Sequence, residues 1–129
     1  MSLNSVPSLI LAAIATLVFS DLAQAELVPV KWDAHGHFVR EFRIEPGKFV
    51  EACEKLPRGT QVAWRFQSAV PLNFNVHYHE GKDVHFPAKK DQVAALDGTL
   101  KVELEQDYCW MWSNKSAGPA VLQVTLERR

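Results

Sequence analysis

The chain has 129 residues, and its 14 basic and 15 acidic residues give a formal net charge of −1. Domains that bind nucleic acid need a concentrated basic surface, so this balance argues against that class of protein. A chain of this length is expected to form one domain, with a core of modest size.

The first 25 residues predict a cleaved secretory signal. Residues 9–19 form an apolar run too short to span a bilayer comfortably, and the small-residue cleavage pattern Ala23-Gln24-Ala25 follows it. We therefore expect one mature domain of residues 26–129, which is periplasmic or secreted and has no membrane insertion. Cleavage removes only one charged residue, Asp21, so the mature charge stays near neutral.

The remaining chain carries mostly strand signals. Alternating or β-rich segments predict strands at 38–44, 49–56, 62–67, 72–78, 84–86, 100–104, 108–112 and 121–126. Turns are expected at 45–47 and 57–59, a short helical turn or a loop crossing at 91–97, and a loop at 114–119. Short strands at this spacing predict an all-β fold, an antiparallel β-sandwich of the jelly-roll kind.

Most of the functional information lies between Leu72 and Phe86, a segment that is typical of a β-hairpin. On its first arm, His77 and His79 alternate with apolar residues, so both imidazoles share one face, roughly 6.5–7 Å apart along the strand. On its second arm, apolar residues flank His85. Two imidazoles at this spacing can reach a single metal ion.

The loop length decides whether His85 joins the other two histidines. Directly opposed residues share a face, and a five-residue loop sets Tyr78 opposite Val84 and His77 opposite His85. That register buries the apolar residues of both arms. A two- or four-residue loop instead sets His85 opposite Tyr78 and turns one apolar set outward. The hydrophobic pattern therefore favours three histidines on one patch, which a bulge would break.

His77, His79 and His85 are the predicted metal ligands, and Glu80 of the turn is a candidate fourth ligand. Imidazole suits copper and zinc, and copper ranks first in the affinity order for nitrogen ligands. The alternative is that these histidines are ordinary residues of a polar sheet face. The pair in His35-Gly36-His37 either extends the site or belongs to a flexible polar lead-in.

Trp110-Met111-Trp112 allows two interpretations. Methionine sulfur and tryptophan faces attract soft cations, which would suit copper(I). In a strand, however, the tryptophans point one way and Met111 points the other way, alongside Cys109, so core packing of the tryptophans is the simpler interpretation. Exposed tryptophans would favour glycan stacking, with Asn73 and Asn75 as hydroxyl partners.

Cys53 and Cys109 are the two cysteines of the chain. In an exported protein we expect them to form one disulfide, which closes a loop of about 57 residues and contributes on the order of 4 kcal/mol. A thiol pair for copper or redox chemistry is the alternative, although the chain has no Cys-x-x-Cys. Asn114-Lys115-Ser116 matches a glycosylation sequon, which matters in a eukaryotic secretory pathway.

The run from Gly59 to Leu126 resembles the GOLD (Golgi dynamics) domain, a jelly-roll-like β-sandwich of eukaryotic cargo receptors and lipid-transfer proteins. The shared features are Cys53, the strand start Gly59-Thr60-Gln61-Val62, Gly98, the aromatic strand Tyr108-Cys109-Trp110, and Asn114-Lys115-Ser116. In the cargo receptors the corresponding cysteines are bonded, which implies the same pair here. The histidines have no counterpart in the family, so the chain looks like a small exported bacterial relative rather than a trafficking protein.

Two functions are expected from these observations. The first is non-enzymatic binding of copper or zinc through the histidine hairpin, in a storage, delivery or tolerance role. The second is an interaction module that binds an exported or envelope protein, or a glycan, and holds no metal. An enzyme is not expected, because the sequence offers no motif for a general base in a shaped cleft.

Overall fold

The structure is a computed structural model that describes Ser2 and residues 26–129. Apart from Ser2, the signal predicted for residues 1–25 lies outside the described residues. In the described part of the chain, no helix has the length and apolar character needed to cross a membrane. Every residue of the hydrophobic core described below comes from residues 26–129.

Within residues 26–129, seven strands make up the domain. They are β1 (Glu26–Pro29), β2 (His37–Ile44), β3 (Phe49–Leu56), β4 (Gln61–Glu80), β5 (Asp83–Lys101), β6 (Gln106–Ser113) and β7 (Ala120–Arg128). All pairings are antiparallel except that of β1, a strand the sequence pattern did not predict, with β3.

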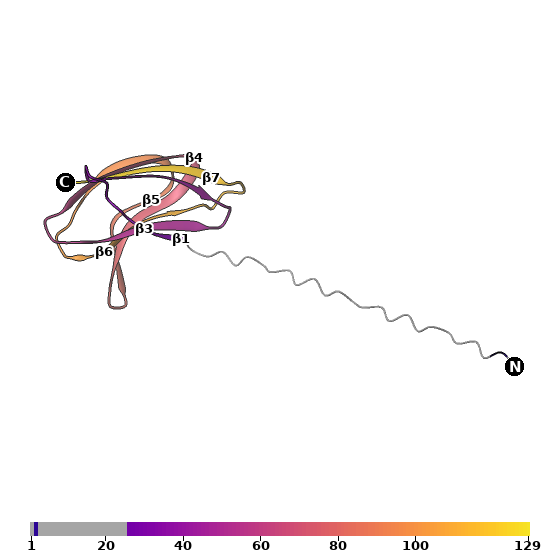
Figure 1. The fold of residues 1–129 in the computed structure, drawn as a ribbon, viewed down its shortest axis with the longest axis horizontal. Coiled ribbons are helices and arrows are strands. Elements are labelled where there is room, and N and C mark those ends of the chain that lie inside the picture. Colours follow the sequence, from indigo (N-terminus) through magenta and orange to yellow (C-terminus); the bar gives the residue numbers. More distant parts are fainter. Residues whose placement is uncertain (1, 3–25) are drawn as a thin grey trace.

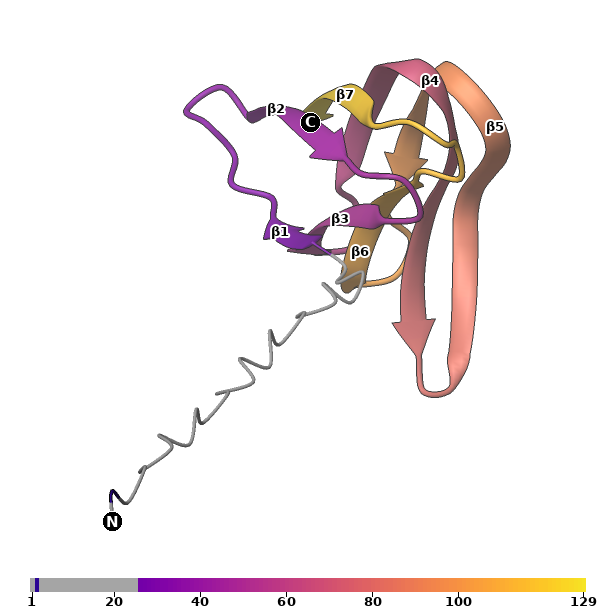
Figure 2. The ribbon, with the colours of Figure 1, turned by 90° about the vertical axis from the view of Figure 1, so that its right-hand side faces the viewer.

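One curled sheet contains all seven strands, in the order β1-β3-β6-β4-β7-β2, with β5 paired to β4. The long strand β4 joins the two halves of this sheet, because it pairs with β7 as far as Ser68 and with β6 from Asn73 onward. The halves face each other, while the β4–β5 hairpin runs along both (Figures 1 and 2). The predicted all-β, sandwich-like fold is confirmed.

The core between the two halves is rich in aromatic side chains. Inward residues of β4 occupy even-numbered positions on both sides of the partner change, and Val62 and Phe74, for example, are 0% and 1% exposed. Trp110 and Trp112 of β6 are equally buried, at 0% and 1% exposure. The predicted core packing of these tryptophans is therefore confirmed, and glycan stacking on them is excluded.

Residues 91–97 belong to β5, so their prediction as a helical turn or loop crossing is wrong. Pairing with β4 continues through this segment, where Val93 lies opposite Leu72. Gln92 has a φ of 52°, which bends the strand at an irregularity of the register. The Oδ1 of Asn73 accepts hydrogen bonds from the backbone N–H and the side-chain amide of Gln92, both 3.0 Å long. Long-range strand pairing thus overrides the local signal.

The predicted disulfide between Cys53 and Cys109 is confirmed. The two residues are directly opposed in β3 and β6, with Cα atoms 4.1 Å apart. No free cysteine remains among the described residues. The bond therefore fixes the register between two central strands of the sheet.

Asn114 of the sequon has a structural role. Its side chain is fully buried, and its Nδ2 donates to the carbonyl oxygens of Ile44 and Gly118 at 2.9 and 2.8 Å. Its Oδ1 accepts hydrogen bonds from the backbone N–H and the hydroxyl of Ser116 at 2.9 and 2.6 Å. Both amide hydrogens are in use, so attachment of a glycan to this nitrogen is incompatible with the folded loop.

Candidate functional site

The β4–β5 hairpin turns through two residues rather than five. The turn consists of Gly81 and Lys82, and Gly81 adopts the φ of +60° that favours glycine at the first position of such a turn. Tyr78 consequently lies opposite His85. The predicted register, with His77 opposite His85, is wrong, and His85 lies on the other face of the hairpin.

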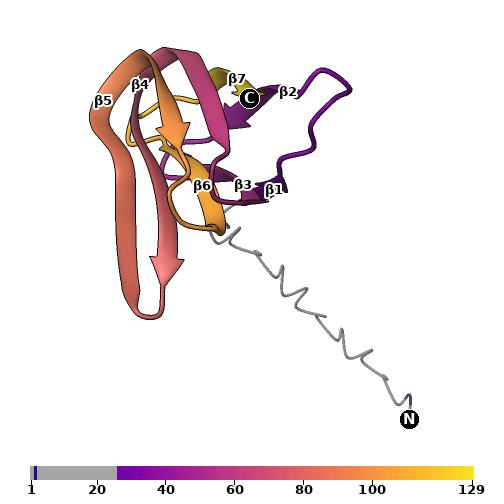
Figure 3. The same cartoon turned by 90° about the vertical axis from the view of Figure 1, so that its left-hand side faces the viewer.

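The two-residue turn leaves the apolar residues of the second arm in solvent. Val84 is 41% exposed and Phe86 is 48% exposed. This end of the hairpin extends beyond the other strands (Figures 2 and 3), so the core does not continue beneath it. The apolar side chains of the second arm therefore have no core to pack against there. The preference of Gly81 for a two-residue turn sets the register of the hairpin instead.

One face of the hairpin forms a groove with the loop between β5 and β6, which we call the Tyr78 groove. It encloses about 570 Å³. The Tyr78 ring stacks on His85, with centroids 4.9 Å apart, and packs edge-on against Tyr108 at 5.2 Å. The Tyr108 hydroxyl donates a 2.7 Å hydrogen bond to the carbonyl of Leu104, whose side chain is 45% exposed. Burial raises the pKa of Tyr108, which keeps this donor protonated.

The opposite face carries His77, whose side chain is 7% exposed. Its Nδ1 lies 2.7 Å from Oδ1 of Asn75, and its Nε2 lies 3.6 Å from Oε1 of Glu51. The exposed His79 ring has its centroid 5.3 Å from that of His77. Two of the predicted histidines therefore share a face, and Glu51 of β3 joins them. Sequence reasoning missed Glu51 because only the pairing of distant strands places it there.

Burial controls the protonation of His77. Desolvation lowers the pKa of His77 below its ordinary value, and this effect outweighs the Glu51 carboxylate, which acts in the opposite direction. The ring is therefore neutral at neutral pH. Because Nδ1 donates its hydrogen to Asn75, the lone pair of the neutral ring lies on Nε2, on the side of Glu51.

The predicted metal ligands do not come together as one set. Among residues 26–129, the one group of at least three His, Cys, Asp or Glu side chains with donor atoms within 4.8 Å of one another is Glu51, Cys53 and Cys109. Its two sulfur atoms are bonded to each other. Glu80, the predicted fourth ligand, is exposed at the turn.

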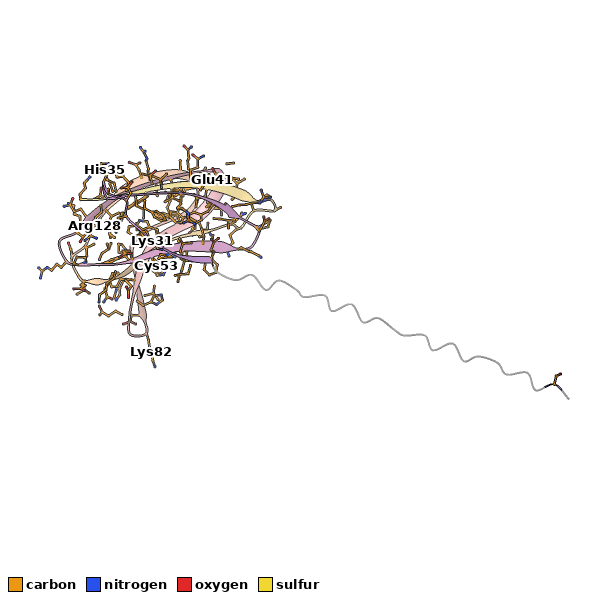
Figure 4. The ribbon with its side chains drawn as sticks, viewed as in Figure 1. Lys31, His35, Glu41, Cys53, Lys82 and Arg128 are labelled. Carbon is orange, nitrogen blue, oxygen red and sulfur yellow. A yellow bond between two sulfur atoms is a disulfide. The ribbon has the colours of Figure 1, made fainter. Side chains whose placement is uncertain are left out.

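His35 lies in an ordered loop before β2, and His37 is the first residue of that strand. Oδ1 of Asp33 accepts hydrogen bonds from the backbone N–H groups of both histidines, each 2.8 Å long, so the segment is not a free lead-in. The Nε2 of His37 lies 4.0 Å from Glu127 of β7. Figure 4 shows His35 well away from Lys82 at the hairpin turn. This pair therefore does not extend the hairpin site.

The hydrogen bonds to Asp33 predict a pH dependence of stability. They lower the pKa of Asp33 below its ordinary value of 3.8. A carboxylate with a lowered folded pKa stabilises the fold above its unfolded pKa, and this contribution is lost as the pH falls through the folded pKa. We expect Asp33→Asn to be less stable than the wild type at pH 6, and we expect this difference in stability to shrink as the pH falls below 3.8. Urea unfolding across this range measures the difference, and a pH-independent difference would contradict the explanation.

The fold of residues 26–129 is similar to that of several solved bacterial structures. The Aeromonas hydrophila PliG, a periplasmic lysozyme inhibitor of g-type lysozyme, is 9% identical with a TM-score of 0.63 over 82% of this chain and 98% of its own. The Salmonella Typhimurium PliG, also a periplasmic inhibitor of g-type lysozyme, is 10% identical with a TM-score of 0.56 over 81% and 99%. The pre-peptidase C-terminal domain of a Bacillus anthracis collagenase is 7% identical with a TM-score of 0.50 over 84% and 97%.

At these identities the likeness shows the fold alone. No family model and no curated protein sequence matches the chain. The resemblance to the GOLD domain therefore stays a prediction.

Proposed function

We propose that residues 26–129 form an exported, non-enzymatic binding protein whose ligand is another exported protein. The observation that carries this proposal is the exposure of Val84 and Phe86 at the projecting end of the β4–β5 hairpin. Neither side chain contributes to the core, and both would lose water-exposed apolar surface on binding a partner.

The hairpin offers contacts on both of its faces. The face that carries His77 and His79 also carries Val84 and Phe86. The face of the Tyr78 groove carries the stacked rings of Tyr78 and His85, with the exposed Leu104 nearby. Aromatic side chains are enriched at protein interfaces, and these two rings are held by packing before any partner arrives. A projecting element with contacts on both faces suits a partner with a cleft better than one with a flat surface.

A lysozyme is the first partner to test. The two PliG proteins share this fold over nearly their whole length, and both are described as periplasmic inhibitors of g-type lysozyme. An enzyme that binds a polymer presents a concave site, which is the shape that the hairpin fits. We therefore propose a g-type lysozyme as the partner and the hairpin end as the element that occupies its cleft.

The double variant Val84→Ser/Phe86→Ser tests this assignment. If the two apolar side chains are buried in the complex, their loss should weaken binding to a g-type lysozyme at least hundredfold, or about 2.7 kcal/mol. Stability should change little, because both residues are exposed in the free protein. Calorimetric titration measures the affinity, and urea unfolding measures the stability.

The matched control is Val39→Ser/Val121→Ser. These valines are 69% and 40% exposed, on β2 and β7, and neither strand pairs with the projecting end of the hairpin. The control should bind as tightly as the wild type. Equal binding of both double variants would show that the hairpin is not the binding element.

A metal function of the three predicted histidines is not proposed, because the observed register separates His85 from His77 and His79. A different set of residues suggests a metal site. It adjoins the proposed binding element, because Val84 lies opposite His79 and the ring centroid of Phe86 lies 6.1 Å from that of His77.

A further inference from the structure

A cluster of side chains with donor atoms lies on the outer face of the sheet, where β3, β6 and β4 are paired side by side. Two rows of residues cross these strands: Cys53, Cys109 and His77 form one row, and Glu51, Met111 and Asn75 form the next. Residues two apart in a strand share a face, so Glu51 and Met111 lie on the same side as the disulfide. The register thus places Glu51 and Met111 on the same face of the sheet as His77.

His77 and Glu51 face each other as two acceptors. The lone pair of His77 lies on Nε2, which is 3.6 Å from Oε1 of Glu51. This distance is too long for a hydrogen bond. It fits two ligands of one ion, because bonds of about 2 Å set ligand atoms roughly 3–4 Å apart. His77 is also more than nine-tenths buried, and this nitrogen has no hydrogen-bond partner among the described residues.

Met111 carries a soft donor atom on this face. A thioether is a soft ligand that prefers copper(I), whereas imidazole accepts copper and zinc alike. Met111 is directly opposed to both Glu51 and Asn75, and Asn75 is two residues before His77 in β4. The exposed His79 can turn its ring toward the same point, since its centroid lies 5.3 Å from that of His77.

We propose that this face holds a copper(I) ion through Nε2 of His77, the imidazole of His79 and the thioether of Met111, with the Glu51 carboxylate supplying a compensating charge. The site replaces the predicted three-histidine site and omits His85. It uses the disulfide only as a brace between β3 and β6, so copper binding does not require reduction of Cys53 and Cys109.

A methyl signal reports on this site directly. The chain has two methionines, Met1 and Met111, so residues 26–129 contain Met111 alone. Protein labelled with carbon-13 at the methionine methyl group should therefore give one peak. One equivalent of copper(I), kept reduced with ascorbate under anaerobic conditions, should move this peak in slow or intermediate exchange. A thiol assay at the end checks that the disulfide is intact.

Two variants assign the ligands, and a third is the matched control. Competition with the chromophoric chelator bicinchoninate measures copper(I) affinity. Met111→Leu keeps the volume of the side chain and should weaken binding at least tenfold, and His77→Gln should weaken it further. His85→Gln removes an exposed histidine from the other face and should leave affinity unchanged.

Specific outcomes would overturn the proposal. An unmoved methyl peak at one equivalent of copper(I) would remove Met111 from the site. Equal affinities of the wild type and Met111→Leu would do the same, even if His77→Gln failed to fold. Loss of affinity in His85→Gln would return the ligand set to the original three histidines.

Discussion

Trp112→Ala should destabilise the domain by about 3–5 kcal/mol, a large part of the stability of a small protein. Trp112 is 1% exposed, and its ring centroid lies 5.7 Å from that of Phe66 and 5.6 Å from that of Phe74. These rings come from both parts of β4, so the truncation leaves a cavity where the two halves of the sheet meet. Urea unfolding followed by circular dichroism measures the loss.

Two substitutions, one at the same position and one at the preceding residue, serve as controls for Trp112→Ala. Trp112→Phe should be milder, because the indole nitrogen has no hydrogen-bond partner among the described residues and only volume is lost. Met111→Leu, one residue away on the outer face, should change stability by less than about 1.5 kcal/mol. A loss below about 1 kcal/mol for Trp112→Ala would mean that Trp112 does not support the core.

Removal of the disulfide should destabilise the domain by about 4 kcal/mol, according to the loop-entropy relation for a closed loop of this length. Cys53 and Cys109 are separated by 56 residues in sequence, so the bond restricts a large part of the unfolded chain. The variant Cys53→Ala/Cys109→Ala should unfold at a much lower urea concentration than the oxidised wild type.

A dithiol reductant distinguishes the disulfide from the cysteine side chains themselves. Reduced wild type should unfold near the midpoint of the double alanine variant, and the variant should not respond to the reductant. An unchanged midpoint on full reduction of the wild type would show that the bond contributes little to stability.

Most strands could be predicted because the alternation of apolar and polar residues is a local signal. The disulfide could be predicted because two cysteines allow only one pairing. The alternation in Val62, Trp64 and Phe66 identifies one strand, and two cysteines in an exported chain allow one pair. The strand at residues 91–97 could not be predicted from local sequence, because the pairing of Val93 with Leu72 depends on a strand that lies elsewhere in the sequence.

The hairpin register was predicted wrongly for a physical reason. The prediction assumed that Val84 and Phe86 must be buried, but the hairpin extends past the core and burial is not available there. Glycine at position 81 then favours a two-residue turn. The exposure of these two side chains, which the pattern excluded, is what suggests a binding element.

The disulfide relates Glu51 to Met111, but it does not relate either residue to His77. Once Cys53 and Cys109 are opposed in antiparallel strands, Glu51 must lie opposite Met111. The sequence does not show that His77 is the residue of β4 beside Cys109, because several strands could pair with β6 there. The pairing of β6 with β4 had to come from the structure.

The most direct test of the central claim is the residual activity of a g-type lysozyme titrated with purified residues 26–129. If the hairpin end occupies the substrate cleft, activity should fall to near zero at one equivalent with the wild type and with Val39→Ser/Val121→Ser. It should remain near its full value with Val84→Ser/Phe86→Ser. Full lysozyme activity in a large excess of the folded wild-type domain would contradict the proposed function.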